Sequence, residues 1–287
     1  MTAKHPKAQE GMIHKRTPGS VVLEIVSILA AFVIFLPILW MACVSLKVNE
    51  LNLGNAFLYF VPPFTLQNYV SILSGRSQVV RWFINSASVA IVVTGVATLI
   101  CTMASYAIAK LRFRYKKAIY GYFLLGLMVP TEATIVSLFV LSNSLGIIDT
   151  YWGLVLPSLA GSMNIIIMSS FMQGIPSDLI DAARIDGANE FSIYINVILP
   201  LSRTVMVTVA IFSFIGNWNS YLWPYLCAMS EDMFTLPVGI PQFISQFSVD
   251  KAIPMTVNMI ASIPILVFFI IFEKQIVKGI TLAGLKG

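Results

Sequence analysis

A polar stretch between two long apolar segments holds the densest group of residues that could do chemistry. Its four carboxylates are those of Asp178, Asp181, Asp186 and Glu190. Carboxylates alone are able to bind a metal ion, but an enzyme site at a membrane face also needs a histidine, a cysteine or an activated serine nearby. The stretch contains neither histidine nor cysteine, so the carboxylates are interpreted as the solvated face of a short helical hairpin.

The histidines and cysteines elsewhere in the chain do not suggest a site either. His5 and His14 both precede the first apolar segment, which excludes a zinc site of the HExxH type. The three cysteines, which lie in or at the ends of apolar segments without paired spacing, are Cys43, Cys101 and Cys227. Buried packing is favoured for them over redox or metal chemistry. We expect no metal site, no cofactor and no catalytic residue in this chain.

Composition indicates which kind of elements position these residues. The chain has 287 residues, of which 57% are hydrophobic and 11% charged, and its mean hydropathy is +0.84. Soluble domains average about a quarter charged residues, so this composition is typical of an integral membrane protein. The little polar sequence excludes a soluble catalytic domain of about 100 residues or more. We expect an all-α integral membrane protein.

Six apolar segments are each near the roughly 20 residues that a helix needs to cross a bilayer. Their predicted bounds are 20–46, 85–109, 118–142, 151–173, 203–227 and 254–272. Six crossings place both ends of the chain on one side. All but four of the 18 lysines and arginines lie on that side, and the four are Lys47, Arg76, Arg81 and Lys251. The positive-inside rule therefore predicts cytoplasmic N- and C-termini.

The first segment also has one feature of a secretory signal, since a basic tail precedes an apolar run. It exceeds the usual apolar core of about 7–15 residues, contains Glu24, and no small-x-small cleavage site follows before Lys47. We interpret it as a membrane helix. A single domain is expected, with a cytoplasmic N-terminal tail (1–19), a six-helix membrane domain (20–278) and a cytoplasmic C-terminal tail (279–287).

Residues 174–202 are predicted to form a hairpin of two short helices. Pro176 suits the first position of the first helix, where its missing N–H costs nothing. Gly187 is placed to end that helix with a left-handed cap, because glycine has no Cβ penalty there. The second helix is expected to break at Leu199-Pro200. Its predicted apolar stripe consists of Phe191, Tyr194, Ile195 and Ile198.

The first of these two helices has a narrow face of small side chains. Leu179, Ala182 and Ala183 lie at i, i+3 and i+4 and so share that face. Small side chains allow another backbone or a side-chain pocket to approach closely. On physical grounds alone, an internal brace and a docking site for another protein explain the face equally well.

Two longer links lie on the opposite side of the predicted membrane, at 48–84 and 228–253. Their prolines, glycines and aromatic residues are typical of short structured loops. Contact with an external partner and simple closure of helix ends both explain these links. Neither is long enough for a separate domain.

The hairpin resembles the EAA motif of ABC importer permeases, the cytoplasmic element that docks into a cleft of the nucleotide-binding subunit. The resemblance rests on Asp181-Ala182-Ala183, on Gly187 and on Ile198-Leu199-Pro200, and it is strongest to the carbohydrate-uptake permeases of the maltose-transporter type. Further marks follow in the same order, namely Ser45-Leu46-Lys47, Thr65-Leu66-Gln67-Asn68-Tyr69, Asn85-Ser86, Val129-Pro130, Asn217-Trp218-Asn219 and Gly279-Ile280-Thr281. The resemblance covers nearly the whole chain and implies a type I ABC importer permease fold with a cytoplasmic coupling helix.

Two positions depart from the family's pattern. Asp181 stands where the motif has glutamate, so the charge is kept but the side chain is one methylene shorter. Thr204 stands where proline commonly follows Leu-Pro-Leu, which leaves the entry into the fifth membrane helix less rigidly set. The family assignment survives both changes, although the first alters the reach of the carboxylate.

The resemblance implies that this subunit couples transport to ATP hydrolysis without hydrolysing ATP itself. The coupling residues that it assigns are Asp181, Ala182, Ala183, Arg184, Ile185, Asp186, Gly187, Leu199 and Pro200. The chain has no P-loop, which needs GxxxxGK followed by Ser or Thr, so ATP and magnesium are expected on partner ATPase subunits. Closure of those subunits would push on residues 177–198 and switch the bundle between outward and inward openings.

Polar and aromatic side chains in and near the apolar segments are candidates for lining a path for a hydroxyl-rich solute. They are Glu132, Asn164, Asn217, Trp218, Asn219, Tyr221 and Asn258. Amides supply hydrogen bonds to hydroxyl groups, and aromatic rings stack on sugar faces. Alternatives stay open, because asparagines within membranes often tie helices together and a carboxylate at the outer interface is simply hydrated.

The resemblance also implies partners in the cytoplasmic membrane and no nucleic acid. These are a second homologous permease, a dimer of nucleotide-binding ATPase subunits, an extracytoplasmic solute-binding protein and membrane lipid. The expected function is ATP-driven, binding-protein-dependent import of a sugar or oligosaccharide by alternating access. The alternative is a secondary transporter driven by an ion gradient, which normally has membrane-embedded charges and internal repeats; here Glu132 is nearly alone and no repeat is visible.

Overall fold

The computed structural model describes residues 18–48, 56–159, 161–246 and 251–284, and within these ranges the chain is helical without a strand. Nearly all of the predicted N-terminal tail, with both histidines, lies outside the described residues. The helices are α1 (Pro18–Ser45), α2 (Gln67–Ser71), α3 (Val79–Lys110), α4 (Lys116–Gly126), α5 (Thr131–Ser144), α6 (Tyr151–Val155), α7 (Ser162–Gln173), α8 (Ser177–Ile185), α9 (Glu190–Ile193), α10 (Leu199–Trp218), α11 (Leu222–Cys227), α12 (Leu236–Gln246) and α13 (Ala252–Gly284). The expected all-α class is confirmed for the described residues.

Four helical segments are long and apolar enough to cross a membrane unaided. They are Gly19–Ser45, Val79–Lys110, Glu190–Trp218 and Ala252–Gln275. Two further pairs are long enough only together, and each pair is bent: α4 meets α5 at 102°, and Tyr151–Leu159 meets α7 at 41°. The described chain therefore has four spans, or up to six if each bent pair crosses once.

The predicted segments differ in how well they match these helices. The first, second and sixth correspond to single helices, α1, α3 and α13. The prediction of one continuous helix over 118–142 is wrong, because the helical chain breaks between Gly126 and Thr131. Pro130 in this break is extended (φ −66°, ψ 134°), and proline also disfavours helical geometry at the residue before it.

The predicted fifth segment, 203–227, is wrong at both ends. A π-helical turn at Tyr194–Ile198 joins α9 to α10, so Leu199-Pro200 does not break the helix. Proline lacks the N–H for a normal helical bond, and a π turn directly before it accommodates the irregular bonding. At the other end, α10 stops at Trp218 and residues 222–227 form the separate helix α11.

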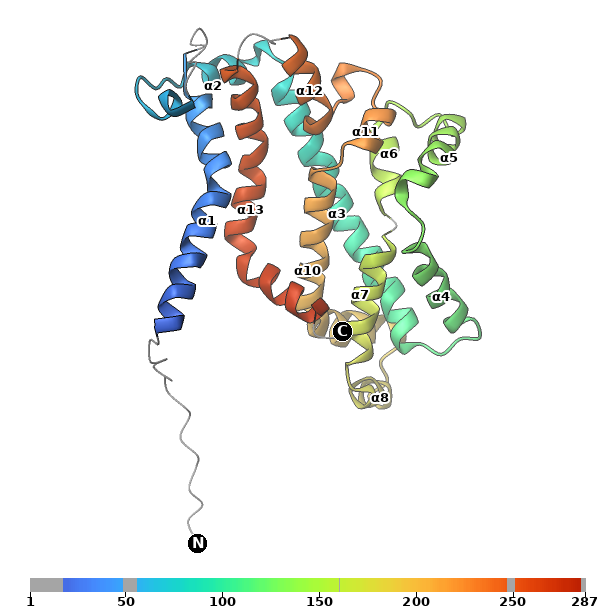
Figure 1. Cartoon of the computed structure of the whole chain (residues 1–287). Coiled ribbons are helices and arrows are strands. Elements are labelled where there is room, and N and C mark those ends of the chain that lie inside the picture. Colours follow the sequence, from blue (N-terminus) through green and yellow to red (C-terminus); the bar gives the residue numbers. More distant parts are fainter. Residues whose placement is uncertain (1–17, 49–55, 160, 247–250, 285–287) are drawn as a thin grey trace.

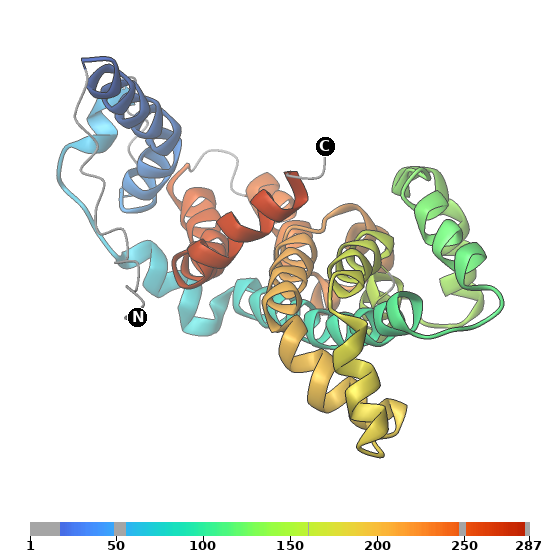
Figure 2. The ribbon, with the colours of Figure 1, turned by 90° about the horizontal axis from the view of Figure 1, so that it is seen from below.

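The bundle is built around α3 (Figures 1 and 2). This helix packs against α7 and α10, while α13 packs against both α10 and α1. Small side chains on α3 are buried at these contacts, among them Ala97, Cys101 and Ser105, and small residues let membrane helices approach closely. Seen from below, α1 and α4 lie on opposite flanks (Figure 2).

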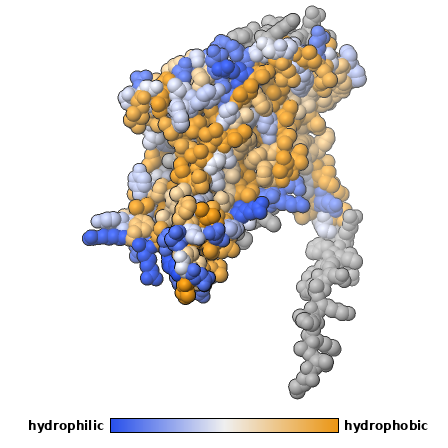
Figure 3. Space-filling view, turned by 180° about the vertical axis from the view of Figure 1, so that it is seen from behind, coloured by the Kyte–Doolittle hydropathy of each residue, from blue (hydrophilic) through white to orange (hydrophobic). Residues whose placement is uncertain are grey.

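The ends of the bundle differ from its middle. The start of α1, the end of α13 and α8 all lie at the lower end in Figure 1. α13 continues to Gly284, so the predicted boundary at 278/279 between membrane domain and tail falls inside a helix. Hydrophobic side chains cover the middle of the face in Figure 3, with hydrophilic ones gathered toward the two ends. This distribution suits a protein surrounded by lipid.

The cysteines behave as predicted. Cys101 and Cys227 are free and buried, and Cys43 is free and half-buried. Among the described residues, no group of three or more histidine, cysteine, aspartate or glutamate side chains is arranged to hold a metal ion.

Candidate functional site

The hairpin, defined here as residues 177–198, projects beyond the ends of α7 and α10 (Figure 1). Its first helix, α8, ends at Gly187, whose φ of 82° is left-handed. The backbone N–H of Gly187 donates to the carbonyl of Arg184 at 3.0 Å. The next N–H, of Ala188, donates to Ala183 at 3.0 Å, and the two bonds together form a Schellman cap. The predicted glycine cap is confirmed.

The small-residue face of α8 is only partly buried, so the structure does not make it the internal brace that was one of the two alternatives. Ile180 is only 3% exposed, and Ala183 packs in the same cluster. Leu179 and Ala182, which were expected to share a face with Ala183, are exposed. Ile180 packs with Met172, Ile175 and Ile193 in one buried cluster, which removes its apolar surface from water. The predicted small-residue face is therefore divided between the inside and the outside.

The second half of the hairpin also departs from its predicted stripe. Ile193, Tyr194 and Ile198 are each 5% exposed or less. Phe191 is instead 65% exposed and Ile195 41%. The bonds of a π turn run from i to i+5, so residues five apart, such as Ile193 and Ile198, share a face. The predicted stripe assumed α-helical spacing throughout.

The outward surface of the hairpin combines apolar side chains with open space. Ile185 is 87% exposed, and Leu179 and Phe191 are also exposed. A Cβ placed on Gly187 meets no atom within 4 Å. Hydrophobic and hydrophilic side chains are mixed at the lower tip in Figure 3. Exposed apolar groups beside an unobstructed backbone are typical of a surface that another protein covers.

A network of charged and polar side chains connects the two halves of the hairpin to α3. Arg184 Nη1 lies 3.1 Å from Asp181 Oδ1, and its Nη2 lies 2.8 Å from Glu190 Oε1. The hydroxyl of Tyr106 on α3 donates to the other oxygen, Glu190 Oε2, at 2.6 Å. The side chain of Arg184 is 43% exposed, so solvent screens both ion pairs and each contributes little to stability. Asp181 thus keeps an ion pair despite being shorter than glutamate.

The entrance of the hairpin is attached to the same end of α3. Lys110 Nζ donates to the carbonyl oxygen of Gln173 at 3.3 Å and to that of Ile175. Carbonyls at a helix end lack partners within the helix, and here the ammonium group supplies one. The sequence interpretation missed Tyr106 and Lys110, because their partners lie 63 to 84 residues away.

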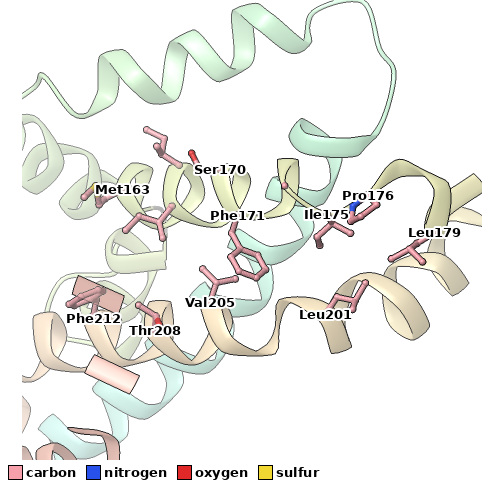
Figure 4. Close-up of a pocket in the computed structure, with 13 residues that line it drawn as sticks. Met163, Ser170, Phe171, Ile175, Pro176, Leu179, Leu201, Val205, Thr208 and Phe212 are labelled. Carbon is pink, nitrogen blue, oxygen red and sulfur yellow. The ribbon is translucent and has the colours of Figure 1, made fainter. Parts of the chain in front are cut away.

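A groove of about 620 Å³ runs between α7 and α10 and reaches the start of the hairpin (Figure 4). Its lining is mostly apolar, with Phe171, Val205 and Phe212 among the labelled side chains. Ser170 and Thr208 supply hydroxyl groups. The lining consists of Met163, Ile166, Ile167, Ser170, Phe171, Gly174, Ile175, Pro176, Leu179, Leu201, Val205, Thr208 and Phe212.

None of the residues predicted to line a solute path belongs to this groove. The amides of Asn217, Asn219 and Asn258 each donate to the carbonyl four residues earlier in the chain. Trp218 is 4% exposed, and its Nε1 donates to Ala261 on α13 at 3.1 Å. Trp218 therefore connects α10 to α13, whereas the asparagines, for which helix-tying was the open alternative, bond within their own helices.

The other three predicted path residues lie on different elements of the fold. The ring of Tyr221 stacks on Tyr225 with centroids 5.4 Å apart. Glu132 is exposed in the first turn of α5, and Asn164 is half-buried in α7.

At the other end of α3, Asn85 and Ser86 form hydrogen bonds with residues 232–236, the segment that leads into α12. We call these contacts the far-end clamp. Asn85 Nδ2 donates to the carbonyls of Asp232 and Phe234, each at 2.8 Å. Ser86 Oγ accepts the backbone N–H of Leu236 at 2.8 Å. The family-like pair Asn85-Ser86 is thus explained by its contacts across the fold.

A second family-like pair of segments meets at the same end. Asn68 Nδ2 donates to the carbonyls of Ser45 and Lys47 at 3.0 and 2.8 Å. The hydroxyl groups of Ser45 and Tyr69 are 2.7 Å apart. Two of the sequence marks therefore form one polar contact that fixes the link after α1.

Comparison with known proteins gives consistent results along the chain. Residues 97–282 match the family described as binding-protein-dependent transport system inner membrane component. The chain is 31% identical to the arabinooligosaccharides transport system permease protein AraQ of Halalkalibacterium halodurans, with 90% of this chain and 93% of that protein covered. It is 32% identical to the trehalose/maltose transport system permease protein MalG of Thermococcus litoralis, with 93% and 97% covered.

A solved structure has a similar fold. It is the crystal structure of a bacterial ABC transporter involved in the import of the acidic polysaccharide alginate. The TM-score is 0.78 at 18% sequence identity, with 90% of this chain and 98% of the other covered. At this identity the likeness concerns the fold alone.

Proposed function

Since this chain belongs to the family of binding-protein-dependent transport inner membrane components, we propose that it is the permease subunit through which such an importer moves a sugar or an oligosaccharide. The chain is a multi-pass protein of the inner membrane and a transport component, and ATP hydrolysis belongs to separate subunits of such systems. Its relatives include arabinooligosaccharides, galactooligosaccharides and trehalose/maltose transport permeases. This supports a saccharide substrate.

The proposed topology has six crossings with both termini in the cytoplasm. Counting each bent helix pair as one crossing supports six. The start of α1, the end of α13 and the hairpin lie at one end of the bundle (Figure 1), as an even number of crossings requires. Arg112, Arg114 and Lys117 lie in or beside the link between α3 and α4 and are exposed, in keeping with a cytoplasmic face.

The proposed site is the hairpin, acting as a coupling element for the ATPase subunits. The observation that carries this proposal is the exposed apolar tip, with Ile185 87% exposed beside the unobstructed Gly187. A partner that covers these residues gains apolar burial. The coupling residues assigned from the family motif, 181–187 with Leu199 and Pro200, form this tip and its junction with α10.

Displacement of the hairpin would also alter the groove of Figure 4. Pro176 and Leu179 line the groove, and Leu179 belongs to α8. The hairpin and the facing helices α7 and α10 therefore share side-chain contacts. A push on α8 is expected to change the separation of α7 and α10, as an alternating-access cycle requires.

The proposed assembly contains one second permease, two ATPase subunits that bind ATP and magnesium, and an extracytoplasmic solute-binding protein. A test is reconstitution of the complex into vesicles with the binding protein added outside. We expect uptake of a radiolabelled saccharide that requires ATP and is inhibited by vanadate. Uptake that follows a proton or sodium gradient without ATP would instead establish a secondary transporter.

A matched pair of glycine variants tests the role of the hairpin. Gly187→Trp fills the open space at the tip and is expected to abolish binding-protein-stimulated ATPase activity. Gly146→Trp is the control, because Gly146 also has a positive φ (66°) and open space around its Cβ but lies in the link after α5. Equal ATPase activity in the two variants would contradict the coupling role.

A further inference from the structure

One end of α3 contacts both the turn that leads into the hairpin and the start of the hairpin's second helix. Lys110 holds the entrance through the carbonyls of Gln173 and Ile175. Tyr106 holds the start of the second helix through Glu190 Oε2 at 2.6 Å. Tyr106 and Lys110 are four residues apart and so lie on one face of α3. α3, which is far from the hairpin in sequence, therefore contacts this region at two points.

The hairpin between these two points is internally braced. Arg184 joins Asp181 to Glu190 across the turn. The Schellman cap fixes the angle of that turn, and Ile180 anchors α8 in the inner cluster. A force on the tip therefore moves the hairpin as one body and reaches α3 through Glu190 and Lys110.

α3 also runs unbroken from this end of the bundle to the other. It is one helix of 32 residues with regular helical geometry, which corresponds to about 48 Å. α7 is bent by 41° relative to the helix before it. At its far end, α3 holds residues 232–236 through Asn85-Ser86.

We propose that α3 is a rigid strut that makes the hairpin and the far-end clamp move together, with Tyr106 and Lys110 as the positioning residues at the inner joint. This inference rests on the proposed function and deepens it by naming the helix that carries the displacement. Without the joint, a push on the hairpin would pass through its covalent connections to α7 and α10 and through the apolar cluster that buries Ile180 and Ile193. The coupling would then lose its direct route to the far end.

Spin labels at the far end of α3 and on the hairpin measure whether these two regions move as one body. Suitable positions are Ile84, 53% exposed on α3, and Asp178, exposed in the first turn of α8 and outside the assigned coupling residues. Each is replaced by a labelled cysteine in a chain whose native cysteines are replaced by serine. The distance distribution is recorded by electron paramagnetic resonance in the full complex, without nucleotide and after trapping with MgATP and orthovanadate.

In the otherwise unaltered chain we expect one distance that is the same in both states. Tyr106→Phe removes the hydroxyl but keeps the ring that packs against Tyr194, with centroids 5.7 Å apart. Lys110→Met removes the ammonium but keeps the length of the stem. With both substitutions, we expect the distribution to broaden and to shift on trapping. The single variant Tyr106→Phe, which preserves packing, is expected to show the same change to a smaller extent.

The chain offers matched controls for both substitutions. Tyr194→Phe removes a buried hydroxyl that has no hydrogen-bond partner among the described residues, in the same cluster as Tyr106. Lys117→Met removes an exposed cation close to Lys110 in sequence. Both controls should match the unaltered chain. The proposed role of α3 is refuted if the distance distribution of the Tyr106→Phe Lys110→Met variant equals that of the controls. It is also refuted if the distance in the unaltered chain already shifts on trapping.

Failure of the proposed function gives a different result. If the chain is no importer subunit, it does not co-purify with an ATPase and cannot be trapped by vanadate. The joint itself is still measurable in the purified chain, where the Tyr106→Phe Lys110→Met variant should broaden the distance distribution without any partner. An unchanged width there counts against the joint, whatever the function.

Discussion

The hairpin and the far-end clamp lie at opposite ends of α3 and are held together in contrasting ways. In the hairpin, Arg184 pairs with residues three and six positions away, and its side chain is 43% exposed. In the clamp, Asn85 is fully buried and bonds to carbonyls 147 and 149 residues away. The ion pairs within the hairpin are thus local and hydrated, whereas the hydrogen bonds of the clamp are buried and long-range.

This contrast has an energetic meaning. An exposed ion pair is worth about 0–1 kcal/mol, whereas a buried polar group left without its partner costs about 1–3 kcal/mol. The clamp should therefore dominate the stability of the bundle. The exposed charged residues of the hairpin should tolerate substitution with little loss of stability, and their substitution should affect coupling instead.

The largest loss of stability is expected from Asn85→Ala. This change leaves the carbonyls of Asp232 and Phe234 and the hydroxyl of Tyr151 without their partner, at a cost of about 3 kcal/mol or more. Thermal unfolding in detergent, followed by near-ultraviolet circular dichroism, measures the loss. Asn219→Ala is the control, because its exposed amide bonds only to its own helix. Equal melting temperatures for the two would break the contrast.

Gly239→Ala should follow, also near the clamp. A Cβ on Gly239 would lie 2.1 Å from Trp82 Cε3, and overpacking of this kind costs about 1–3 kcal/mol. Gly216→Ala is a suitable control, since a Cβ there meets nothing within 4 Å. The same unfolding measurement should separate them, and a Gly239→Ala protein as stable as Gly216→Ala would count against a closely packed far end.

A smaller, pH-dependent effect is expected at Asp149. Burial by itself raises the pKa of Asp149, but hydrogen bonds from the backbone of Ser230 and Met229 and from the Ser230 hydroxyl outweigh it, so the pKa lies below its ordinary value. The stabilisation is therefore complete above the unfolded pKa of about 3.9 and is lost as the pH falls through the lowered folded pKa.

Unfolding of Asp149→Asn and of the unaltered chain, compared at pH 7 and near pH 3, tests this effect. At pH 7 the variant should be less stable by about 1 kcal/mol, the typical worth of such a bond. The difference should shrink at the acidic pH. An equally large difference at both values would mean that the charge of Asp149 contributes nothing.

The smallest stability effect is expected from Arg184→Gln in the hairpin. Loss of its two exposed ion pairs should lower the stability only slightly, and added salt should reduce the difference further. Unfolding at low and high sodium chloride measures both quantities. A loss as large as that of Asn85→Ala would overturn the distinction between the two ends.

Several features of the fold were predictable because they depend only on residues that are close in sequence. Gly187 ends α8 in a left-handed cap, as glycine after a helix indicates. α1, α3 and α13 follow from the lengths of their apolar runs, because a helix satisfies its own backbone within a membrane. The break near Pro130 and the π turn before Pro200 were missed, although proline marks both places.

Other features had no local signal. Tyr106 reads as an ordinary aromatic residue of an apolar segment, and only the arrangement of α3 beside the hairpin brings its hydroxyl to Glu190. Trp218 is a candidate for a solute path in the sequence, and only the tertiary structure brings its Nε1 to the carbonyl of Ala261 on α13. The rotation of α8 likewise depends on the cluster that receives Ile180.

The sequence by itself determined the membrane class, the approximate long helices, the cap at Gly187 and the family motif. These depend on hydrophobicity and on residues within a few positions of one another. Only the tertiary structure decided which side chains meet, such as Tyr106 with Glu190 and Asn85 with residues 232–234. The physical reason is that lipid is as apolar as the side chains it surrounds, so hydrophobicity places a helix in the membrane without selecting its neighbours. Packing and hydrogen bonds make that selection.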